Sequence, residues 1–479
     1  MKSSNIGEKI FKDIATVSFG NILYLLSNIL VGFFLPVILG VTSYGYYRIY
    51  VLYVSYCGLL HYGFVDGILL KYAGKKFEEI DKSALRCYTR TFISAEFITT
   101  IITILGALLF ASNEYKPILC FVGINITLTN VTLYYQYLSQ AVGRYREFSL
   151  RKILSAIGQV LIIAIFYIGY QTKQEWSQNY YIYIILVQVI SLGLLLWYIY
   201  TYRTITFGKR NPLSDEIKNI GSMLKVGIVM TVAYETSRLV LLIDQQFVSL
   251  LFDINTYSQY SFAYNLLSCV TAVITGKSTV MLPRLKQIKD DEVIKKFEPL
   301  MSLVAGLVCF FLLGYHPIKI IVTYLMPAYT HSIVYFQIVF PILALSSCIT
   351  IVIFTFYKVL GKCERYLFAC FISLVISAVL NLIVYYVFKT TISISVASII
   401  TTVIWYLISI RYLVKNYHVK WKKNFCYTLV MILIFYASSF GINNIFLQML
   451  VYLIAYLLVT SVIFKNEIIR QFIKHKESI

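Results

Sequence analysis

Long apolar runs separated by short charged breaks divide almost the whole of this 479-residue sequence. Each run is about long enough to cross ~30 Å of hydrocarbon as a helix that rises ~1.5 Å per residue. In lipid, only helices and closed barrels satisfy every backbone polar group, so the sequence predicts an all-α polytopic membrane protein with about fourteen transmembrane helices. The runs lie near residues 14 to 38, 47 to 70, 91 to 111, 117 to 140, 153 to 170, 180 to 201, 224 to 251, 259 to 282, 300 to 324, 333 to 357, 367 to 388, 392 to 414, 425 to 443 and 446 to 464.

The composition agrees with this class and excludes others. The chain is 59% hydrophobic and only 13% charged, which is not the balance of a soluble globular protein. Its net charge of +20 would suggest a nucleic-acid partner in a soluble chain, but here the basic residues lie in the breaks between apolar runs, so we expect no nucleic-acid binding. The nine cysteines are scattered without a CxxC pair, so we expect no metal site and no disulfide framework. The first run is too long for a signal peptide, so we expect no cleavable signal.

The basic residues also predict the orientation. With an even number of spans, 35 of the 42 Lys and Arg residues fall at the two termini and in the breaks on one side, and five fall in the breaks on the other side. Basic residues concentrate in cytoplasmic loops, so both termini are predicted to be cytoplasmic.

The grouping of the runs predicts three regions and no soluble domain, because the longest breaks have only about twenty residues. Residues 1–210 would form an N-terminal lobe of six spans, residues 211–416 a C-terminal lobe of six spans, and residues 417–479 a helix pair and cytoplasmic tail. A weak repeat supports two equivalent lobes, since Thr42 to Tyr47 and Asn255 to Tyr260 follow the first span of each group.

Several short patterns, together with the layout of spans, resemble a Wzx-type polysaccharide flippase of the multidrug/oligosaccharidyl-lipid/polysaccharide (MOP) exporter superfamily. The patterns are Leu39-Gly40 followed by Tyr44-Gly45, Gly63-Phe64-Val65-Asp66-Gly67, Ile243-Asp244, Tyr257 to Tyr264, and Leu282-Pro283.

This resemblance implies two six-helix, MATE-like lobes around a central cavity, in a multi-pass protein of the bacterial cytoplasmic (inner) membrane. The implied activity is transport and not enzymatic catalysis: an undecaprenyl-diphosphate-linked oligosaccharide would move to the outer leaflet for O-antigen or capsule assembly. A polysaccharide polymerase and a chain-length regulator are the implied protein partners.

Charged residues inside the apolar run from Leu224 to Leu251 are the first candidates for a site. An Arg in mid-membrane costs roughly 2.5–3.5 kcal/mol on insertion scales, so Arg238 should face protein or a wet cavity. Glu235 lies three residues before Arg238 on the same helix face, whereas Asp244 points to the opposite side. Glu235 and Arg238 either neutralise each other within the helix or contact the diphosphate or acidic sugars of a substrate.

Two further cations are candidate substrate contacts. Lys277, six residues before Pro283, either reaches the cytoplasmic interface with its long side chain or adds a second positive group to the cavity. Arg48 either anchors the outer interface or contacts substrate.

Asp66, Glu96, Asp244 and His61 are candidates for gating or ion coupling. Asp66 and Glu96 flank the break from residue 71 to 90, where they would form local salt bridges or a gate. Asp244 would tie two helices together near the outer end or take part in ion coupling. His61 is either a packing histidine or a proton carrier.

Two other functions fit a polytopic chain. A multidrug or organic-cation antiporter of the same superfamily would share the fold, but residues 15–40 contain no carboxylate and the deep charges include Arg238 and Lys277, which favours an anionic substrate. A membrane-embedded polysaccharide polymerase would need a larger outward loop. No GxxxxGK[ST] motif for ATP is present, so we expect no bound cofactor and energy from an H⁺ or Na⁺ gradient or from the substrate's own gradient.

Overall fold

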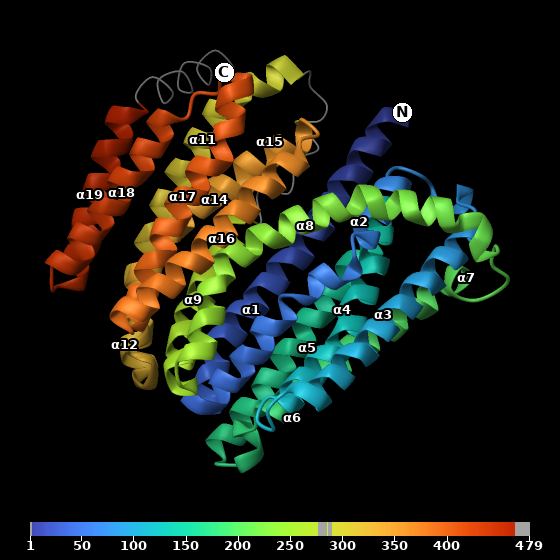
Figure 1. Ribbon diagram of the computed structural model, residues 1–479, viewed down its shortest axis with the longest axis horizontal. Helices are drawn as coiled ribbons and strands as arrows, with labels where there is room; N and C mark the ends of the chain where they lie inside the picture. The colour runs from blue at the N-terminus through green and yellow to red at the C-terminus, as the bar shows by residue number, and fades with distance from the viewer. Residues whose placement is uncertain (1, 276–284, 286–289, 465–479) are drawn as a thin grey trace. The chain divides into compact units, whose positions relative to one another are not determined.

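The computed structural model describes residues 2–275, 285 and 290–464. All regular secondary structure in these residues is helical (Figure 1). The chain divides into two compact units, one that ends at Glu235 and one that begins at Thr236. This boundary falls inside helix α8 (Leu213–Leu251), so the first part of α8 packs with the N-terminal helices.

Twelve helical segments of the described residues are long and apolar enough to cross a membrane. They are Thr16–His61, Lys82–Phe110, Lys116–Ala141, Tyr145–Gln171, Tyr180–Thr201, Leu213–Leu251, Glu292–Leu325, Ile342–Val359, Cys363–Phe388, Thr391–Tyr417, Lys422–Gly441 and Ile445–Ile463. The predicted run near 259 to 282 coincides with α9 (Ile254–Thr275) as far as the described residues extend. Fourteen spans and cytoplasmic termini remain predictions.

The first predicted break lies at Gly40, within α1 (Lys2–Val54). Gly40 has φ 73° and ψ 172°, a region that essentially only glycine occupies, so the helix before it and the helix after it differ in direction. A glycine therefore stands at the point where α1 changes direction, because other residues rarely adopt this backbone conformation.

Unit 1 contains seven further helices around a core rich in tyrosine. They are α2 (Phe64–Tyr72), α3 (Lys82–Phe110), α4 (Lys116–Ala141), α5 (Tyr145–Gln171), α6 (Tyr180–Thr201), α7 (Arg203–Thr206) and the first part of α8. Helix α1 packs along α5, and α4 packs against both α2 and α3.

Two arginines of α3 form hydrogen bonds with backbone carbonyls of the segment that follows α6. Arg86 donates to the carbonyls of Thr204 and Lys209, each at 2.8 Å. Arg90 donates to the carbonyls of Thr206 at 2.9 Å and Gly208 at 2.8 Å. These two predicted cytoplasmic cations therefore bind the carbonyls at the end of α7 and after it, and fix that segment to unit 1.

The predicted span from residue 47 to 70 is wrong as a continuous helix. Helix α1 ends at Val54, a 3₁₀ turn covers Cys57–His61, and α2 starts only at Phe64. Tyr62 and Gly63 both adopt left-handed backbone conformations, which end the turn and redirect the chain. We call residues 55–63 the broken segment.

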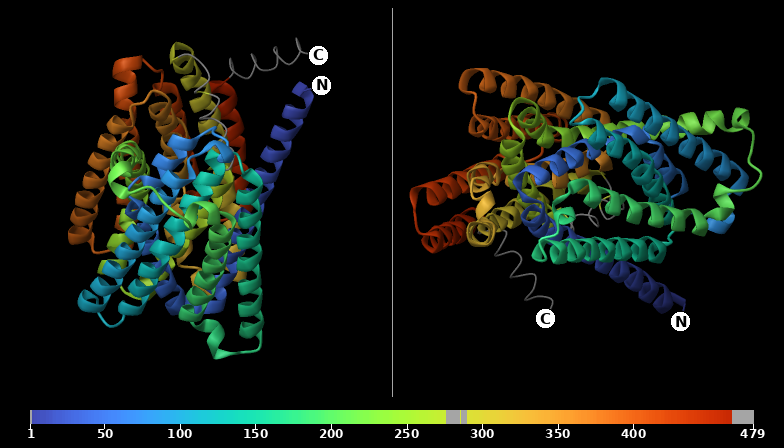
Figure 2. Two further views of the ribbon diagram at one scale, coloured as in Figure 1. Left: turned by 90° about the vertical axis from the view of Figure 1, so that its right-hand side faces the viewer. Right: turned by 90° about the horizontal axis from the view of Figure 1, so that it is seen from below.

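Unit 2 is built on the second part of α8 and on helices that include several short pieces. They are α9 (Ile254–Thr275), α11 (Asp290–Phe311), α12 (Tyr315–Leu325), α13 (Ser332–Val339), α14 (Ile342–Ser347), α15 (Phe354–Val359), α16 (Cys363–Phe388), α17 (Thr391–Tyr417), α18 (Lys422–Gly441) and α19 (Ile445–Ile463), with a π-helical turn at Cys348–Ile353. Helices α18 and α19 pair with each other, as the two red ribbons of Figure 2 show, and both contact α11.

Asp253 caps the N-terminus of α9 and provides a test of this part of the fold. Its carboxylate accepts hydrogen bonds from the backbone N–H groups of Asn255 at 2.9 Å and Thr256 at 3.0 Å, and from the Thr256 hydroxyl at 2.5 Å. The hydrogen bonds from Thr256 come first among the causes that lower the pKa of Asp253 below its usual value. We expect Asp253→Ala to lower the free energy of unfolding by about 0.5–1 kcal/mol, the low end for a cap because the site is exposed.

The pH dependence of this effect has a defined sign. Because the pKa of Asp253 is lower in the folded state, its ionised carboxylate stabilises the fold at pH values above the unfolded-state pKa of ~3.9. This stabilisation is lost as the pH falls through the folded-state pKa. Thermal unfolding of the purified protein should therefore separate wild type from Asp253→Ala at neutral pH and converge in acid. Asp253→Asn keeps an acceptor at the cap, so at neutral pH it should lose less stability than Asp253→Ala; because asparagine does not titrate, its difference from wild type should also shrink in acid. A difference that grows in acid would contradict this assignment.

Candidate functional site

The side chains of Glu96 and Asn130 hold the start of the broken segment in place. Asn130 on α4 donates to the Cys57 carbonyl at 3.1 Å and to Glu96 Oε2 at 2.9 Å. Glu96 on α3 and Asn130 are both fully buried. Glu96 Oε1 has no hydrogen-bond partner and Glu96 no ion pair among the described residues, so the local salt bridge considered for it is not formed there.

The other end of the broken segment brings His61 and Asp66 into the same region. His61 is 5% exposed, and its Nδ1 accepts a hydrogen bond from the Gly63 backbone N–H at 3.3 Å. Asp66, in the first turn of α2, is within electrostatic range of His61 and accepts a hydrogen bond from the Thr231 hydroxyl of α8. The negative carboxylate lies at the positive N-terminal end of α2, where the helix dipole stabilises it.

Helix α8 approaches this region closely because glycines line both sides. A Cβ atom on Gly227 would lie 1.9 Å from the Gly63 carbonyl oxygen, and one on Gly67 would lie 2.5 Å from the Met223 carbonyl oxygen. Further along α8, Glu235 is 6% exposed and fills the space that a side chain on Gly58 would need.

Four sequence-predicted residues therefore gather around the broken segment: Glu235, Glu96, Asp66 and His61. Non-helical backbone at membrane depth is tolerated only where protein or a wet cavity surrounds it, and broken helices line ion and substrate sites in transporters. Carboxyl groups and an imidazole in this setting can take up a proton or a cation. The sequence did not identify Asn130, which joins Glu96 to the Cys57 carbonyl, or Thr231, which donates to Asp66.

Asp244 forms a second buried polar centre within unit 2. It is 2% exposed and accepts hydrogen bonds from Tyr260 at 2.9 Å, from Tyr264, and from Ser398 Oγ at 2.6 Å. The tyrosines lie on α9 and the serine on α17, so Asp244 joins three helices where the sequence suggested two.

The remaining predicted cations are two half-buried arginines and one lysine outside the described residues. Arg238 is half-buried on α8, three residues after Glu235. Arg48 is half-buried in the part of α1 that follows Gly40. Lys277 lies outside the described residues.

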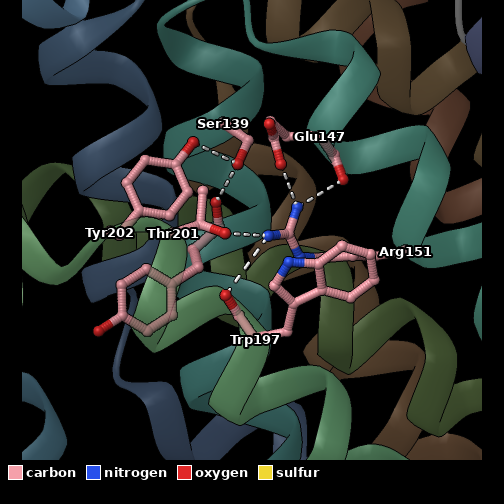
Figure 3. Close-up of polar contacts among 7 residues, drawn as sticks. Ser139, Glu147, Arg151, Trp197, Thr201 and Tyr202 are labelled. Atoms are coloured by element: carbon pink, nitrogen blue, oxygen red, sulfur yellow. Dashed lines mark hydrogen bonds and ion pairs between the residues drawn. The ribbon is translucent and has the colours of Figure 1, made fainter.

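Arg151 is a buried charge that the sequence does not reveal, because it lies in the predicted cytoplasmic break between the runs that end at 140 and begin at 153. Helix α5 already begins at Tyr145, and Arg151 is 1% exposed. Its guanidinium donates to Glu147 Oε2 at 2.6 Å and to Thr201 Oγ1 at 2.5 Å (Figure 3). The guanidinium carbon also lies 4.7 Å from the centroid of the Trp197 ring and 4.0 Å from that of the Tyr198 ring. The contacts join α5 to α6, so we interpret Arg151 as a packing residue.

No protein-family model matches the sequence, and no curated protein does. Solved structures do match. The inward closed conformation of the lipid II flippase MurJ aligns with a TM-score of 0.68 and 14% identity, over 96% of this chain and 100% of that chain. The chain has the MurJ fold.

Two MATE transporter structures also align with this chain, at lower TM-scores. A mutant of the Vibrio cholerae MATE transporter VcmN aligns with a TM-score of 0.55 and 12% identity, over 86% of this chain and 98% of that chain. The inward-facing conformation of a multidrug resistance MATE family transporter of the MOP superfamily aligns with a TM-score of 0.56 and 14% identity, over 88% of this chain and 96% of that chain. At these identities the likeness concerns the fold, and the function must be argued from the site.

Proposed function

We propose that this protein is a flippase of the MOP superfamily that moves a lipid-linked oligosaccharide across the bacterial cytoplasmic membrane. The specific cargo is an undecaprenyl-diphosphate-linked repeat unit for surface polysaccharide, either O-antigen or capsule. Transport proceeds by alternating access, in which the N-terminal lobe rocks against the C-terminal lobe.

The observation that carries the proposal is the alignment with MurJ over nearly the whole of both chains. The matched protein is a flippase whose named cargo, lipid II, is a lipid. The MATE alignments have lower TM-scores and cover less of this chain.

The position of Arg238 supports an anionic cargo. Arg238 lies about fourteen residues into its predicted span, roughly 21 Å from the cytoplasmic end. A guanidinium binds phosphate oxygens in a bidentate manner, so we assign the diphosphate to Arg238, with Glu235 orienting it from the same helix face. Lys277 and Arg48 are the further proposed contacts with the diphosphate or sugars.

The broken segment supports coupling to an ion gradient. Glu96 is buried with a single amide donor, and its second oxygen is an acceptor without a partner among the described residues. We propose that Glu96 takes up H⁺ or Na⁺ and that the Asn130 amide relays this change to the Cys57 carbonyl. Asp66 and His61 would respond at the other end of the segment, and Asp244 would serve in the other unit.

A cation antiporter is the second candidate, because the MATE transporters share the fold and because Glu96 and Asp244 are buried carboxyl groups. Against it, residues 15–40 contain no carboxylate that could bind a cation within the first span.

The test is complementation of a strain that lacks its own repeat-unit flippase. We expect the unmutated gene to restore surface polysaccharide and to remove the lipid-linked repeat unit that accumulates on the cytoplasmic side without it. Analysis of the accumulated lipid by mass spectrometry would identify the cargo. Resistance to cationic dyes without any restored polymer would instead establish the antiporter.

A further inference from the structure

A pocket at the end of α17 lies apart from the site described above. It has a volume of about 300 Å³ and is lined by Leu407, Ile410, Arg411, Val414, Lys415 and Trp421. This volume is at the lower end of the range for small-molecule sites. The pocket lies within unit 2, where α17 ends at Tyr417 and α18 begins at Lys422.

The lining has two chemically distinct parts. Arg411 and Lys415 are one helical turn apart, so their side chains project from the same face of α17. Both side chains are exposed, and neither forms an ion pair among the described residues. Leu407, Ile410 and Val414 form the apolar part.

Trp421 lies between the two helices and completes the pocket. Its ring centroid is 5.5 Å from that of Phe425 and 6.4 Å from that of Tyr406, so the indole is held by aromatic packing. A tryptophan beside a basic group is typical of the level where acyl chains meet lipid headgroups.

The surrounding charge is uniformly positive along the chain. Five basic residues occur from 411 to 423, at the end of the run from 392 to 414 and in the following break, which is predicted to be cytoplasmic, and no Asp or Glu occurs from residue 365 to 466. Clusters of four to eight basic residues directly cytoplasmic of a membrane helix bind anionic lipids.

We propose that this pocket binds one anionic phospholipid of the cytoplasmic leaflet. The phosphodiester lies between Arg411 and Lys415, and the start of an acyl chain lies along Leu407 and Val414 beneath the Trp421 indole. This lipid is a constituent of the bilayer and not the transported cargo, so the proposal is independent of the proposed function.

The test is native mass spectrometry of the purified full-length protein titrated with phosphatidylglycerol, with phosphatidylcholine as the zwitterionic control. We expect a bound phosphatidylglycerol whose apparent Kd rises about 30-fold in the double variant Arg411→Ala/Lys415→Ala, which corresponds to roughly 1 kcal/mol for each cation. Leu407→Trp keeps both cations and fills the pocket, and it should also displace the lipid. Both variants are at exposed positions, so folding should be retained.

The matched control is Lys209→Ala/Arg210→Ala, which makes the same charge change at two exposed positions of unit 1. It should leave the apparent Kd unchanged. An equal loss in this control, equal binding of phosphatidylcholine, or displacement of the lipid by inorganic phosphate alone would overturn the proposal. Tighter binding of a polyprenyl diphosphate at the same residues would overturn it as well, because the pocket would then belong to the cargo.

Discussion

A strain whose flippase is replaced by the Arg238→Glu variant is expected to lose its surface polysaccharide while the protein level in the membrane is maintained. A hydrogen bond between ions contributes about 1.5–3 kcal/mol, and reversal of the charge replaces that attraction with repulsion of the diphosphate. The transport rate should therefore fall by about 100-fold or more. The measurements are the amount of surface polymer and of the accumulated lipid-linked repeat unit.

Two further variants separate a substrate contact from a structural role. Arg238→Lys keeps the charge but not the planar fork, so it should retain part of the activity. Lys209→Glu makes the same reversal of charge at an exposed position of unit 1 and should transport normally. Normal polymer from Arg238→Glu would rule out the assigned contact with the diphosphate. A thermal unfolding midpoint well below that of wild type would show that the residue acts through folding.

The helical class and the positions of most spans could be predicted because apolar length alone specifies them in a membrane. The break in the second predicted span could not be predicted, since residues 47–70 are as apolar as the runs that form continuous membrane helices. The available signal was Gly58 together with Gly63, but glycines are common in membrane helices and the pattern alone does not tell a break from a close contact. The structure has both: Gly63 turns the chain and also contacts α8.

The sequence identified most of the charged residues of the candidate site, but not which of them lie close together or what they bind. Asp244 was recognised as a buried charge, but Ser398, its partner on α17, lies 154 residues away, and no periodicity connects positions that far apart. Arg151 is the opposite case, a buried charge that the sequence did not identify. Its charge suggested a loop, whereas Glu147, one helical turn earlier, neutralises it and lets it lie inside the helical layer.

The close approach of α2 and α8 depends on having no side chain at Gly227. Real Cβ atoms essentially never come within 3.0 Å of another heavy atom, and a Cβ on Gly227 would lie 1.9 Å from the Gly63 carbonyl oxygen and 2.9 Å from the Gly67 nitrogen. Both are backbone atoms, so no rotamer change can relieve the overlap, and the two helices must separate. Their separation would also break the hydrogen bond between Thr231 and Asp66.

Gly227→Ala is therefore expected to lower the free energy of unfolding by about 3 kcal/mol or more, as the sum of overpacking and of the lost hydrogen bond from Thr231 to the buried Asp66 carboxylate. Gly221→Ala is the matched control, because it lies on the same helix and its Cβ would meet no atom within 4 Å. That variant should be neutral or more stable by roughly 0.5–1 kcal/mol, since alanine favours a helix over glycine. Thermal unfolding of both purified variants measures the difference, and equal midpoints would show that α2 and α8 do not pack this closely. If Gly227→Ala keeps its fold but loses transport, we would infer that transport needs the close contact of α8 with the start of α2, where Gly63 contacts α8 and Asp66 accepts the Thr231 hydrogen bond.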